Sequence, residues 1–153
     1  MTLALRRAGP EDAERLWRWR NDPAARAASH VTDPAPWDAH RLWFEQSLTR
    51  VDRLLLVGVY AETREPVGLV RFDVRDLGVW TVGINVAPDF RGLGLGKALL
   101  RVGMARLAEQ RHVGVFEAEV RLTNAASLAL FEHCGFARAG EAGGFARFEK
   151  AVA

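Results

Sequence analysis

The stretch of sequence that decides the organisation of this chain is Val82-Gly83-Ile84-Asn85-Val86-Ala87-Pro88-Asp89-Phe90-Arg91-Gly92-Leu93-Gly94-Leu95-Gly96-Lys97. Its first part alternates apolar and other residues up to Val86, which predicts a strand that ends before Pro88, because proline cannot donate to a strand ladder. Its second part holds three glycines at alternating positions between Arg91 and Lys97. A helix that ends near Arg111 is predicted to follow, from the helical spacing of Leu99, Leu100, Gly103, Met104 and Leu107.

A strand, a glycine-rich turn and a helix N-terminus together predict a binding site for an anion. Glycines let several backbone N–H groups converge on one point, and the helix dipole adds partial positive charge there. Arg91 and Lys97 bring full charges to the same place. The ligand that this pattern predicts is a phosphate or pyrophosphate. The alternative, a plain strand-to-helix connection, does not usually need three glycines and two flanking cations.

Two common phosphate-binding templates do not fit this turn. The nucleoside-triphosphate loop needs Gly-x-x-x-x-Gly-Lys followed by Ser or Thr, but Arg91 stands at its first glycine and Ala98 at its hydroxyl residue. The dinucleotide fingerprint Gly-x-Gly-x-x-Gly meets Lys97 at its third glycine. A third template, Arg/Gln-x-x-Gly-x-Gly/Ala, is matched in full by residues 91–96.

On this third motif the chain resembles the GNAT family of N-acetyltransferases. A second segment, Asn124-Ala125-Ala126-Ser127-Leu128-Ala129-Leu130-Phe131-Glu132-His133-Cys134-Gly135-Phe136, is similar to the family's Asn-x-x-Ser…Leu-Tyr/Phe-x-x-x-Gly-Phe pattern. The resemblance covers essentially the whole chain, so residues 1–153 are expected to form a single acetyltransferase domain. It implies an α/β (mixed α+β) acyl-CoA N-acyltransferase fold, with a mixed, mostly antiparallel sheet of about seven strands and helices on both faces.

Periodicity and turn residues predict the other elements of the chain. Strands are expected at residues 2–8, 54–61, 66–74, 79–86, 113–122, 136–139 and 145–152. Besides the helix that follows the glycine-rich turn, helices are expected from residues 9–12 to just before Pro23, and at 22–29, 38–50 and 125–134.

The bulk properties of the chain are those of an ordinary globular protein. Of the 153 residues, 49% are hydrophobic and 26% are charged. The 21 basic and 19 acidic residues are interspersed, which argues against nucleic acid as a partner. A single cysteine, Cys134, excludes an internal disulfide and fits a reducing compartment. Without an apolar signal core or a membrane-length apolar run, we expect a cytoplasmic monomer or homodimer, without a metal site, that acts on a small-molecule amine.

The resemblance implies acetyl-CoA as co-substrate and a set of residues that hold it. Strands 79–86 and 113–122 would splay apart, and the pantetheine arm would lie in the gap and bond to the open strand edge. Backbone N–H groups around Val86 and Ala87 would polarise the thioester carbonyl, and Asn124 would bond near the pantetheine or a bound water. Asn124 is equally suited to cap the helix that it precedes. The expected CoA-binding residues are Val86, Ala87, Arg91, Gly92, Leu93, Gly94, Leu95, Gly96, Lys97, Asn124, Ser127 and Phe131.

Acetyl transfer to an amine needs a base for the amine, stabilisation of the carbonyl oxygen and a proton for the thiolate. Many family members carry at position 131 a tyrosine whose hydroxyl gives this proton, which Phe131 cannot do. The alternative proton sources are solvent, the departing amine's proton, His133 or Cys134. Glu119, which alternates with Glu117, could act as a base through water, and Asp73 is a weaker candidate. A solvated sheet face or a charge pair between strands also explains such carboxylates. Asn124 and Glu119 are therefore the predicted catalytic residues.

The N-terminal third resembles the subgroup that acetylates nucleotide-linked deoxy-amino sugars, such as enzymes of the flagellin nonulosonic-acid pathway. Those enzymes carry a Trp-Arg-Asn segment, as at residues 19–21, and a His-x-x-Trp-Phe segment, as at residues 40–44. Arg20, His40 and Trp43 are the expected acceptor-binding residues. Arg20 can pair with phosphate, His40 has a pKa near the working pH, and the Trp43 ring can stack on a sugar or a base. Trp17 and Phe44 are expected in the helix core.

Two other functions remain open for this chain. One is acetylation of protein N-termini, because ribosomal-protein acetyltransferases share a similar Asn-Asp-Pro segment, here residues 21–23. The other is a catalytically weak CoA-binding regulatory module, for which Phe131 and the absence of an obvious base are the arguments.

Overall fold

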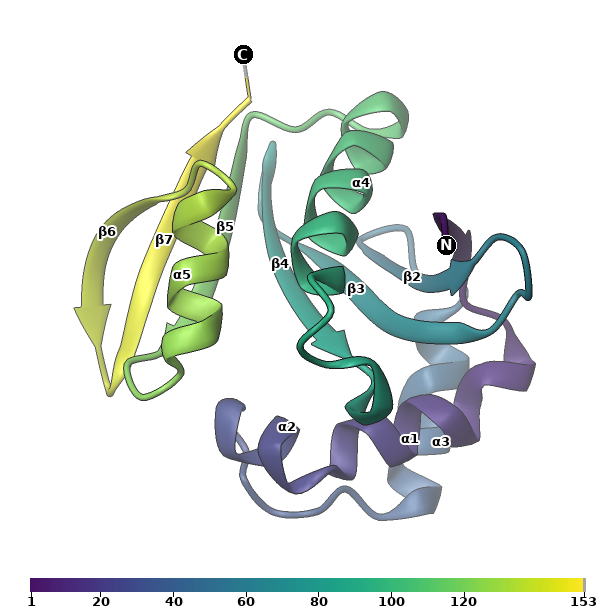
Figure 1. Ribbon diagram of the computed structural model, residues 1–153. Helices are drawn as coiled ribbons and strands as arrows, with labels where there is room; N and C mark the ends of the chain where they lie inside the picture. The colour runs from purple at the N-terminus through teal and green to yellow at the C-terminus, as the bar shows by residue number, and fades with distance from the viewer. Residues whose placement is uncertain (153) are drawn as a thin grey trace.

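The computed structural model describes residues 1–152 and contains one seven-stranded sheet with helices on both faces (Figure 1). The strand order is β1-β2-β3-β4-β5-β7-β6, and all neighbours are antiparallel except β4 and β5. The strands are β1 (Leu3–Arg7), β2 (Arg53–Tyr60), β3 (Pro66–Asp76), β4 (Val79–Val86), β5 (Val115–Arg121), β6 (Ala137–Ala142) and β7 (Phe145–Ala151). The predicted fold class is confirmed.

Five α-helices and two short 3₁₀ turns connect the strands. The α-helices are α1 (Ala13–Asn21), α2 (Pro23–Ala28), α3 (Trp37–Ser47), α4 (Leu95–Gln110) and α5 (Ala125–His133), and the 3₁₀ turns are Pro10–Asp12 and Pro88–Phe90. In Figure 1, α4 and α5 lie over one face of the sheet, and α2 lies beyond the far ends of β4 and β5. No helix within residues 1–152 is long and apolar enough to span a membrane.

The two faces of β3 belong to two hydrophobic cores. Val70 and Phe72 lie beneath Gly103 of α4, in the large core that α4 and α5 cover. Leu69 faces the other way, into a smaller core built around Leu16 of α1 and Phe44 of α3. Because both faces are covered, β2 is buried along nearly its whole length and reads as a continuous apolar run. The predicted helix after the glycine-rich turn buries all five of its expected apolar positions.

The central feature of the sheet is a gap between β4 and β5. The two strands pair only at three positions, from Val79 with Val115 to Thr81 with Glu117. Beyond these pairs the strands diverge, as Figure 1 shows, so the rest of β4 has no partner on the β5 side. The splay that the family resemblance implied is confirmed.

The two largest errors in the predicted boundaries, at the ends of α3 and β6, are of three residues each and have identifiable reasons. The helix expected at residues 38–50 ends at Ser47, because the N–H groups of Thr49 and Arg50 donate to carbonyls three residues back, which tightens the chain into a turn. The strand expected at 136–139 continues to Ala142 as β6, because an irregularity in register between Arg138 and Gly140 is absorbed before the strand resumes pairing with β7.

A buried carboxylate fixes the start of α1. Asp12 is 0% exposed, and its oxygens accept bonds from Arg6 (2.7 and 2.8 Å), from Arg15 (2.7 Å) and from the backbone N–H of Gly9 (2.8 Å). Burial acts to raise the pKa of Asp12, but the bonds from Arg6 and Gly9 and the charges of both arginines outweigh it. The pKa therefore lies below the ordinary value of 3.8. A lowered folded-state pKa means that the stabilisation is present above the unfolded-state pKa and is lost as the pH falls through the folded-state value.

Replacing Asp12 by asparagine is expected to lower the free energy of unfolding at pH 7 by about 2–3 kcal/mol. The loss is smaller than for a wholly buried pair, because Arg6 and Arg15 are 36% and 37% exposed and can be hydrated. Urea unfolding from pH 7 to pH 2 measures it, and the difference from wild type should shrink below about pH 4. Asp33→Asn, in an exposed loop, is the control. Equal stability of wild type and Asp12→Asn at pH 7 would contradict this account.

Candidate active site

The glycine-rich turn leaves the start of α4 open. Gly92 and Gly94 have φ values of 78° and 77°, in the left-handed region that favours glycine, and a Cβ at either would have no atom within 4 Å. No side chain caps the N-terminus of α4, so the N–H groups of its first turn lack an intrahelical partner. Lys97 is exposed on this first turn. Free donors, a helix dipole and a cation in an uncovered cradle fit a pyrophosphate.

Arg91 braces this turn against the α1–α2 junction. Its guanidinium donates to Asp22 (2.8 Å), to the carbonyl of Val86 (3.1 Å) and to the side-chain oxygen of Asn85 (3.4 Å). The Arg91 hydrogen bond is the main cause of a lowered pKa at Asp22, whose carboxylate also caps α2 by accepting from the N–H of Ala25. The expected role of Arg91 as a free charge for the ligand is therefore revised, because in this conformation its side chain is bound to the protein.

The backbone of β4 presents alternate residues to the gap. The N–H of Ala87 donates to the carbonyl of Val67 on the β3 side (2.8 Å). Alternate residues of an antiparallel strand direct their backbone groups to opposite sides, so those of Val86 and Ile84 point toward β5. Of the two N–H groups expected to polarise the thioester, only that of Val86 has the required direction, and that of Ala87 is already bonded.

Asn124 has room for both of its expected roles. Its side-chain oxygen accepts from the N–H of Ser127 (3.2 Å) and so caps α5. Its side-chain NH₂ group has no hydrogen-bond partner within residues 1–152. One side chain can thus cap the helix through oxygen and donate to a ligand through nitrogen.

Replacing Asn124 separates these two roles. Asn124→Ser keeps a capping oxygen and should leave the free energy of unfolding nearly unchanged, whereas Asn124→Ala should lower it by about 1 kcal/mol. Both variants lack the NH₂ donor, so both should lower kcat/KM about tenfold. Urea unfolding and steady-state thiol release measure the two effects. Full activity of the Asn124→Ser variant would contradict the ligand-donor role and leave helix capping as the remaining role of Asn124.

Phe131 lies in the core rather than at a ligand surface. It is 4% exposed, meets Phe136 edge to face at 5.0 Å between ring centroids, and stacks near Phe148 at 6.0 Å. Its expected place among the CoA-binding residues is revised to packing. Cys134 is buried as well, as expected for a small apolar packing residue, which removes it as a convenient proton donor for the thiolate.

The three candidate bases differ in how far they are already paired. Both oxygens of Asp73 are bonded, to Arg53 (2.6 Å) and Arg71 (2.7 Å). Both oxygens of Glu117 accept from Arg75 (2.6 and 2.8 Å). Glu119 is 57% exposed, and one of its oxygens lies 3.1 Å from Nε2 of His30. Of the three, Glu119 therefore keeps an oxygen available to a water or an amine.

His40 is buried instead of lining a pocket. It is 1% exposed, with Nε2 at 3.0 Å from the carbonyl of Ala13 and Nδ1 at 3.5 Å from Nη1 of Arg20. A carbonyl only accepts, so Nε2 carries the proton and Nδ1 accepts from Arg20. Burial is the main cause of its lowered pKa, and the Arg20 charge adds to it. His40 is therefore neutral, and its expected contact with the acceptor is revised to the positioning of Arg20.

Two side chains of α1, those of Trp17 and Asn21, hold the loop between α2 and α3. The indole N–H of Trp17 donates to the carbonyl of Ala35 (2.8 Å), and the side chain of Asn21 bonds both backbone groups of Ala35 (2.9 and 2.8 Å). Phe44 is 0% exposed, as expected for the helix core. Asn21 of the Trp-Arg-Asn segment is thus explained by its contacts with this loop.

The sequence did not reveal that the segment after α2 contacts strands β5 and β7. Arg121 of β5 donates twice to the carbonyl of Ser29 (2.6 and 3.1 Å). The ring of His30 stacks on Phe145 of β7 at 3.8 Å, while also pairing with Glu119. These partners are far apart in the sequence, so no local pattern predicts their contact. The segment ties α2 to β5 and β7 beside the gap.

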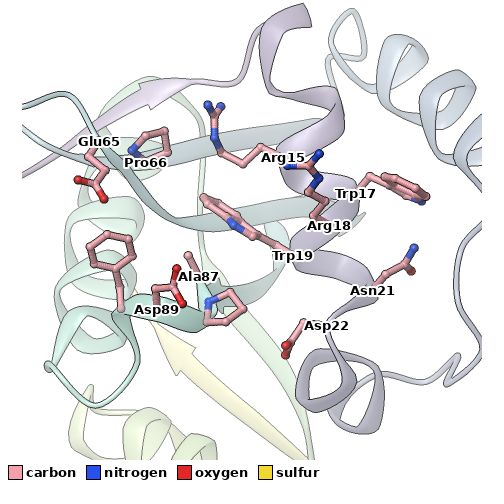
Figure 2. Close-up of a pocket in the computed structure, with 12 residues that line it drawn as sticks. Arg15, Trp17, Arg18, Trp19, Asn21, Asp22, Glu65, Pro66, Ala87 and Asp89 are labelled. Carbon is pink, nitrogen blue, oxygen red and sulfur yellow. The ribbon is translucent and has the colours of Figure 1, made fainter.

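A separate open cavity of about 640 Å³ lies on the β3 side of the end of β4. Figure 2 shows the side chain of Trp19 within it, between α1 and the turn that holds Ala87 and Asp89. It adjoins the glycine-rich turn but is distinct from the gap, which lies on the β5 side of β4. No cluster of three or more potential metal ligands occurs in the part of the chain that the structure describes.

Comparison with known families decides the identity of this fold. The family model for the acetyltransferase (GNAT) domain matches residues 2–137. The chain belongs to the GNAT acetyltransferase family. GNAT acetyltransferases use acetyl-CoA, and the open start of α4 together with the splayed strands of this GNAT chain fits that molecule.

Individual relatives match over shorter segments. A segment of 53 residues is 47% identical to the [ribosomal protein bS18]-alanine N-acetyltransferase of Escherichia coli, and 60 residues are 42% identical to the mycothiol acetyltransferase of Salinispora tropica. These segments are 35% and 39% of this GNAT chain, and they span only 35% and 19% of the two relatives. The spermidine N-acetyltransferase of Vibrio cholerae, solved with CoA and spermine, superposes with a TM-score of 0.87 over 97% of this chain and 95% of that one, at 17% identity.

Proposed function

We propose that the chain transfers the acetyl group of acetyl-CoA to a primary amine, by direct attack within a ternary complex. The observation that carries this proposal is that the gap between β4 and β5 opens beside an uncapped, glycine-rich helix start. The helix start suits the pyrophosphate of acetyl-CoA, and the free backbone edges of the gap suit its pantetheine arm. Acetyl-CoA supplies the activated acyl group.

Three groups of the chain are assigned roles in this reaction. The N–H of Val86 points into the gap and would donate to the carbonyl oxygen as negative charge develops on it. The NH₂ group of Asn124 donates to the bound pantetheine or to a water. Glu119 accepts the amine's proton, directly or through a water. Phe131 has no proton to give, so solvent, or the second proton that the attacking nitrogen loses as the amide forms, serves the thiolate, which is a fair leaving group at a pKa of about 8.5.

For the acceptor we propose a nucleotide-linked amino sugar. Arg20 supports this, because a guanidinium pairs with phosphate. The expected stacking of Trp43 on the acceptor is revised, because three arginines of the protein already surround its ring. A peptide N-terminus is the second candidate, and the 47% identity to a ribosomal-protein alanine acetyltransferase over 53 residues favours it. The two acceptors differ in charge, which makes them separable in an assay.

Thiol release with a panel of amines tests this function. Purified protein with acetyl-CoA is given a nucleotide-linked amino sugar, a peptide that begins with alanine, or spermidine, and a variant with Gly92→Ala and Gly94→Ala is the matched control. Thiol release above hydrolysis with at least one amine, reduced in the control, is expected. Binding of acetyl-CoA without turnover on any amine would instead favour a CoA-binding regulatory module.

A further inference from the structure

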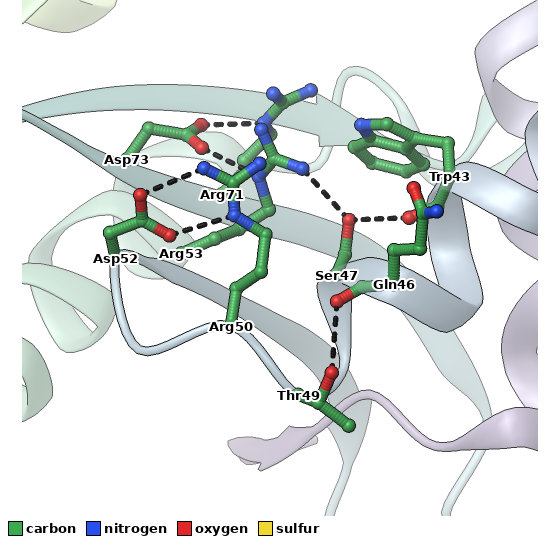
Figure 3. A network of polar contacts seen from close by, with 9 residues as sticks. All are labelled: Trp43, Gln46, Ser47, Thr49, Arg50, Asp52, Arg53, Arg71 and Asp73. Carbon is green, nitrogen blue, oxygen red and sulfur yellow. Dashed lines mark hydrogen bonds and ion pairs between the residues drawn. The ribbon is translucent and has the colours of Figure 1, made fainter.

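Three arginines surround the indole of Trp43, on the face of the sheet that α1 and α3 cover. The guanidinium carbons of Arg71, Arg53 and Arg20 lie 4.9, 5.2 and 5.5 Å from the ring centroid. Cations at this distance are attracted by the face of an aromatic ring. Arg53, Arg71 and the Trp43 ring lie close together in Figure 3. The ring therefore holds three positive charges near one another.

One carboxylate serves this arginine cluster of Arg20, Arg53 and Arg71. Asp73 accepts from the Nε atoms of both Arg53 (2.6 Å) and Arg71 (2.7 Å), as Figure 3 shows. The neighbouring ion pair of Arg50 with Asp52 is neutral by itself. Three positive charges thus face one negative charge. Arg53 is 11% exposed and also donates to Ser47, so it is held within the protein.

Arg20 and Arg71 keep donors that the protein does not use. The two terminal nitrogens of Arg71, and Nε and Nη2 of Arg20, have no hydrogen-bond partner within residues 1–152. The side chain of Arg71 is 40% exposed, and Arg20 is exposed as well. Partial burial, and next the charge of Arg71, lower the pKa of Arg20, which indicates that the two like charges are close. Such a pair lowers its electrostatic energy when an anion binds between its members.

The two arginines lie beside the proposed site of acetyl transfer. Arg71 is the register partner of Gly83 on β4, and paired residues of an antiparallel ladder project from the same face. A Cβ built on Gly83 would have no atom within 4 Å, so open space lies next to Arg71 toward the gap. Glu119 projects from the same face on β5, since it alternates with Glu117, the partner of Thr81. The face of the gap where the acceptor would lie thus has the cationic Arg20 and Arg71 at one edge and the acidic Glu119 at the other.

We propose that Arg20 and Arg71 bind an anionic group, a carboxylate or a phosphate, that the acceptor carries in addition to its amine. The inference rests on the proposed acetyl transfer and narrows its substrate class. The amine lies toward Glu119 and the anion toward the guanidiniums, so the acceptor carries a carboxylate or a phosphate besides its amine, as a nucleotide-linked amino sugar does, and is not a polyamine. Neutral His40 holds Arg20, and Asp73 holds Arg71, in this position.

Acceptor pairs that differ only in the anion test the proposal. An amino acid is compared with its amide, and an amino sugar 6-phosphate with the free amino sugar, at saturating acetyl-CoA. Wild type should favour the anionic member of at least one pair by about 10- to 100-fold in kcat/KM. The pair that shows the preference distinguishes a carboxylate from a phosphate. Equal kcat/KM within both pairs would overturn the proposal.

Variants assign the preference to the two arginines. Arg20→Gln and Arg71→Gln should each lose most of it, because kcat/KM should fall more for the anionic acceptor than for the neutral one, chiefly through a higher KM. Arg71→Lys, which keeps the charge, should restore part of it. Arg50→Gln removes an arginine of the neutral pair nearby and should keep the full preference. An unchanged preference in both glutamine variants, each shown to be folded by thermal unfolding, would overturn the assignment.

A binding measurement keeps the anion site testable if no amine is acetylated. The side-chain Nε–H resonances of arginine in the CoA-loaded protein are followed by NMR during titration with inorganic phosphate or acetate. Shifts of the Arg71 resonance that saturate, and that are absent for Arg50, are expected. Their presence without turnover would mean that acetyl transfer fails but the anion site stands. Absence of a shift with either anion would refute the site itself.

Discussion

Replacing Gly94 by alanine is expected to raise the dissociation constant for acetyl-CoA about tenfold, whereas replacing Gly96 should change it less than about threefold. The two positions are neighbours in the same motif but differ in backbone conformation. Gly94 has a φ of 77°, where an L side chain costs about 1–2 kcal/mol. Gly96 lies within α4, and a Cβ there would meet Leu130 at 3.4 Å and Val86 at 3.7 Å, which is ordinary contact.

The effect on affinity follows from how the strain at Gly94 is relieved. In the free protein, an alanine at this position would leave the left-handed region, and the N–H groups of the first turn of α4 would rotate away from their common point. Binding would then have to restore the strained conformation, at the cost of that strain. The added Cβ itself would clash with nothing, so the loss comes from the backbone rather than from blocked space.

Calorimetric titration with acetyl-CoA measures both variants against wild type. Thermal unfolding serves as the control, since both variants should stay folded, and alanine in place of Gly96 is also a better helix former than glycine. A Gly92→Ala variant should resemble Gly94→Ala, because Gly92 has a φ of 78°. Equal affinities of the Gly94 and Gly96 variants would mean that the left-handed turn does not shape the site.

The bracing of the turn by Arg91 links the two halves of the proposed site. Arg91 is the first residue of the motif, and its bond to Asp22 reaches the start of α2. Asn85 of β4 also donates to the carbonyl of Trp19 at the end of α1. The turn that suits the donor and the helices beside the acceptor are therefore one mechanically connected unit. This explains why Arg91 is useful in the motif even while its side chain is bound to the protein.

Local patterns predicted most of the secondary structure. The bounds expected for the strand 79–86 were right, because alternation ends at Pro88 and nothing distant competes with it. The second strand of the last hairpin was expected to begin at residue 145, as β7 does, and the two glycines before it, Gly143 and Gly144, have positive φ values (58° and 84°), as a two-residue turn requires. The splay of β4 and β5 was expected only from the family resemblance, since no residue of either strand encodes it locally.

The parts of the site that the sequence did not predict depend on distant partners. Nothing near Glu119 in the sequence shows that His30 meets it, or that Glu117 is bound to Arg75. His40 has a polar ring and was expected at a pocket, but two partners within the protein satisfy both ring nitrogens. Exposure and pairing are properties of the folded chain. They decide which of several chemically suitable residues remains free to act.

Replacing Glu119 by glutamine is expected to lower kcat about 100-fold, the size of effect typical of a general base. Glutamine keeps the shape of the side chain and can still accept a bond from His30, so the fold should be unchanged. Glu117→Gln is the matched control, because that carboxylate is 12% exposed and both its oxygens are held by Arg75. Its loss should affect the free energy of unfolding more than kcat.

Two measurements separate a chemical role of Glu119 from a structural one. Calorimetry should give the same dissociation constant for acetyl-CoA in Glu119→Gln as in wild type, because the residue projects toward the acceptor side of β5. Single-turnover kinetics should place the loss in the acetyl-transfer step. A similar fall in kcat in both glutamine variants would show that Glu119 is not the base. In that case the ion pairs of Glu119 with His30 and of Glu117 with Arg75 would support the structure of the site, and the amine would lose its proton to solvent.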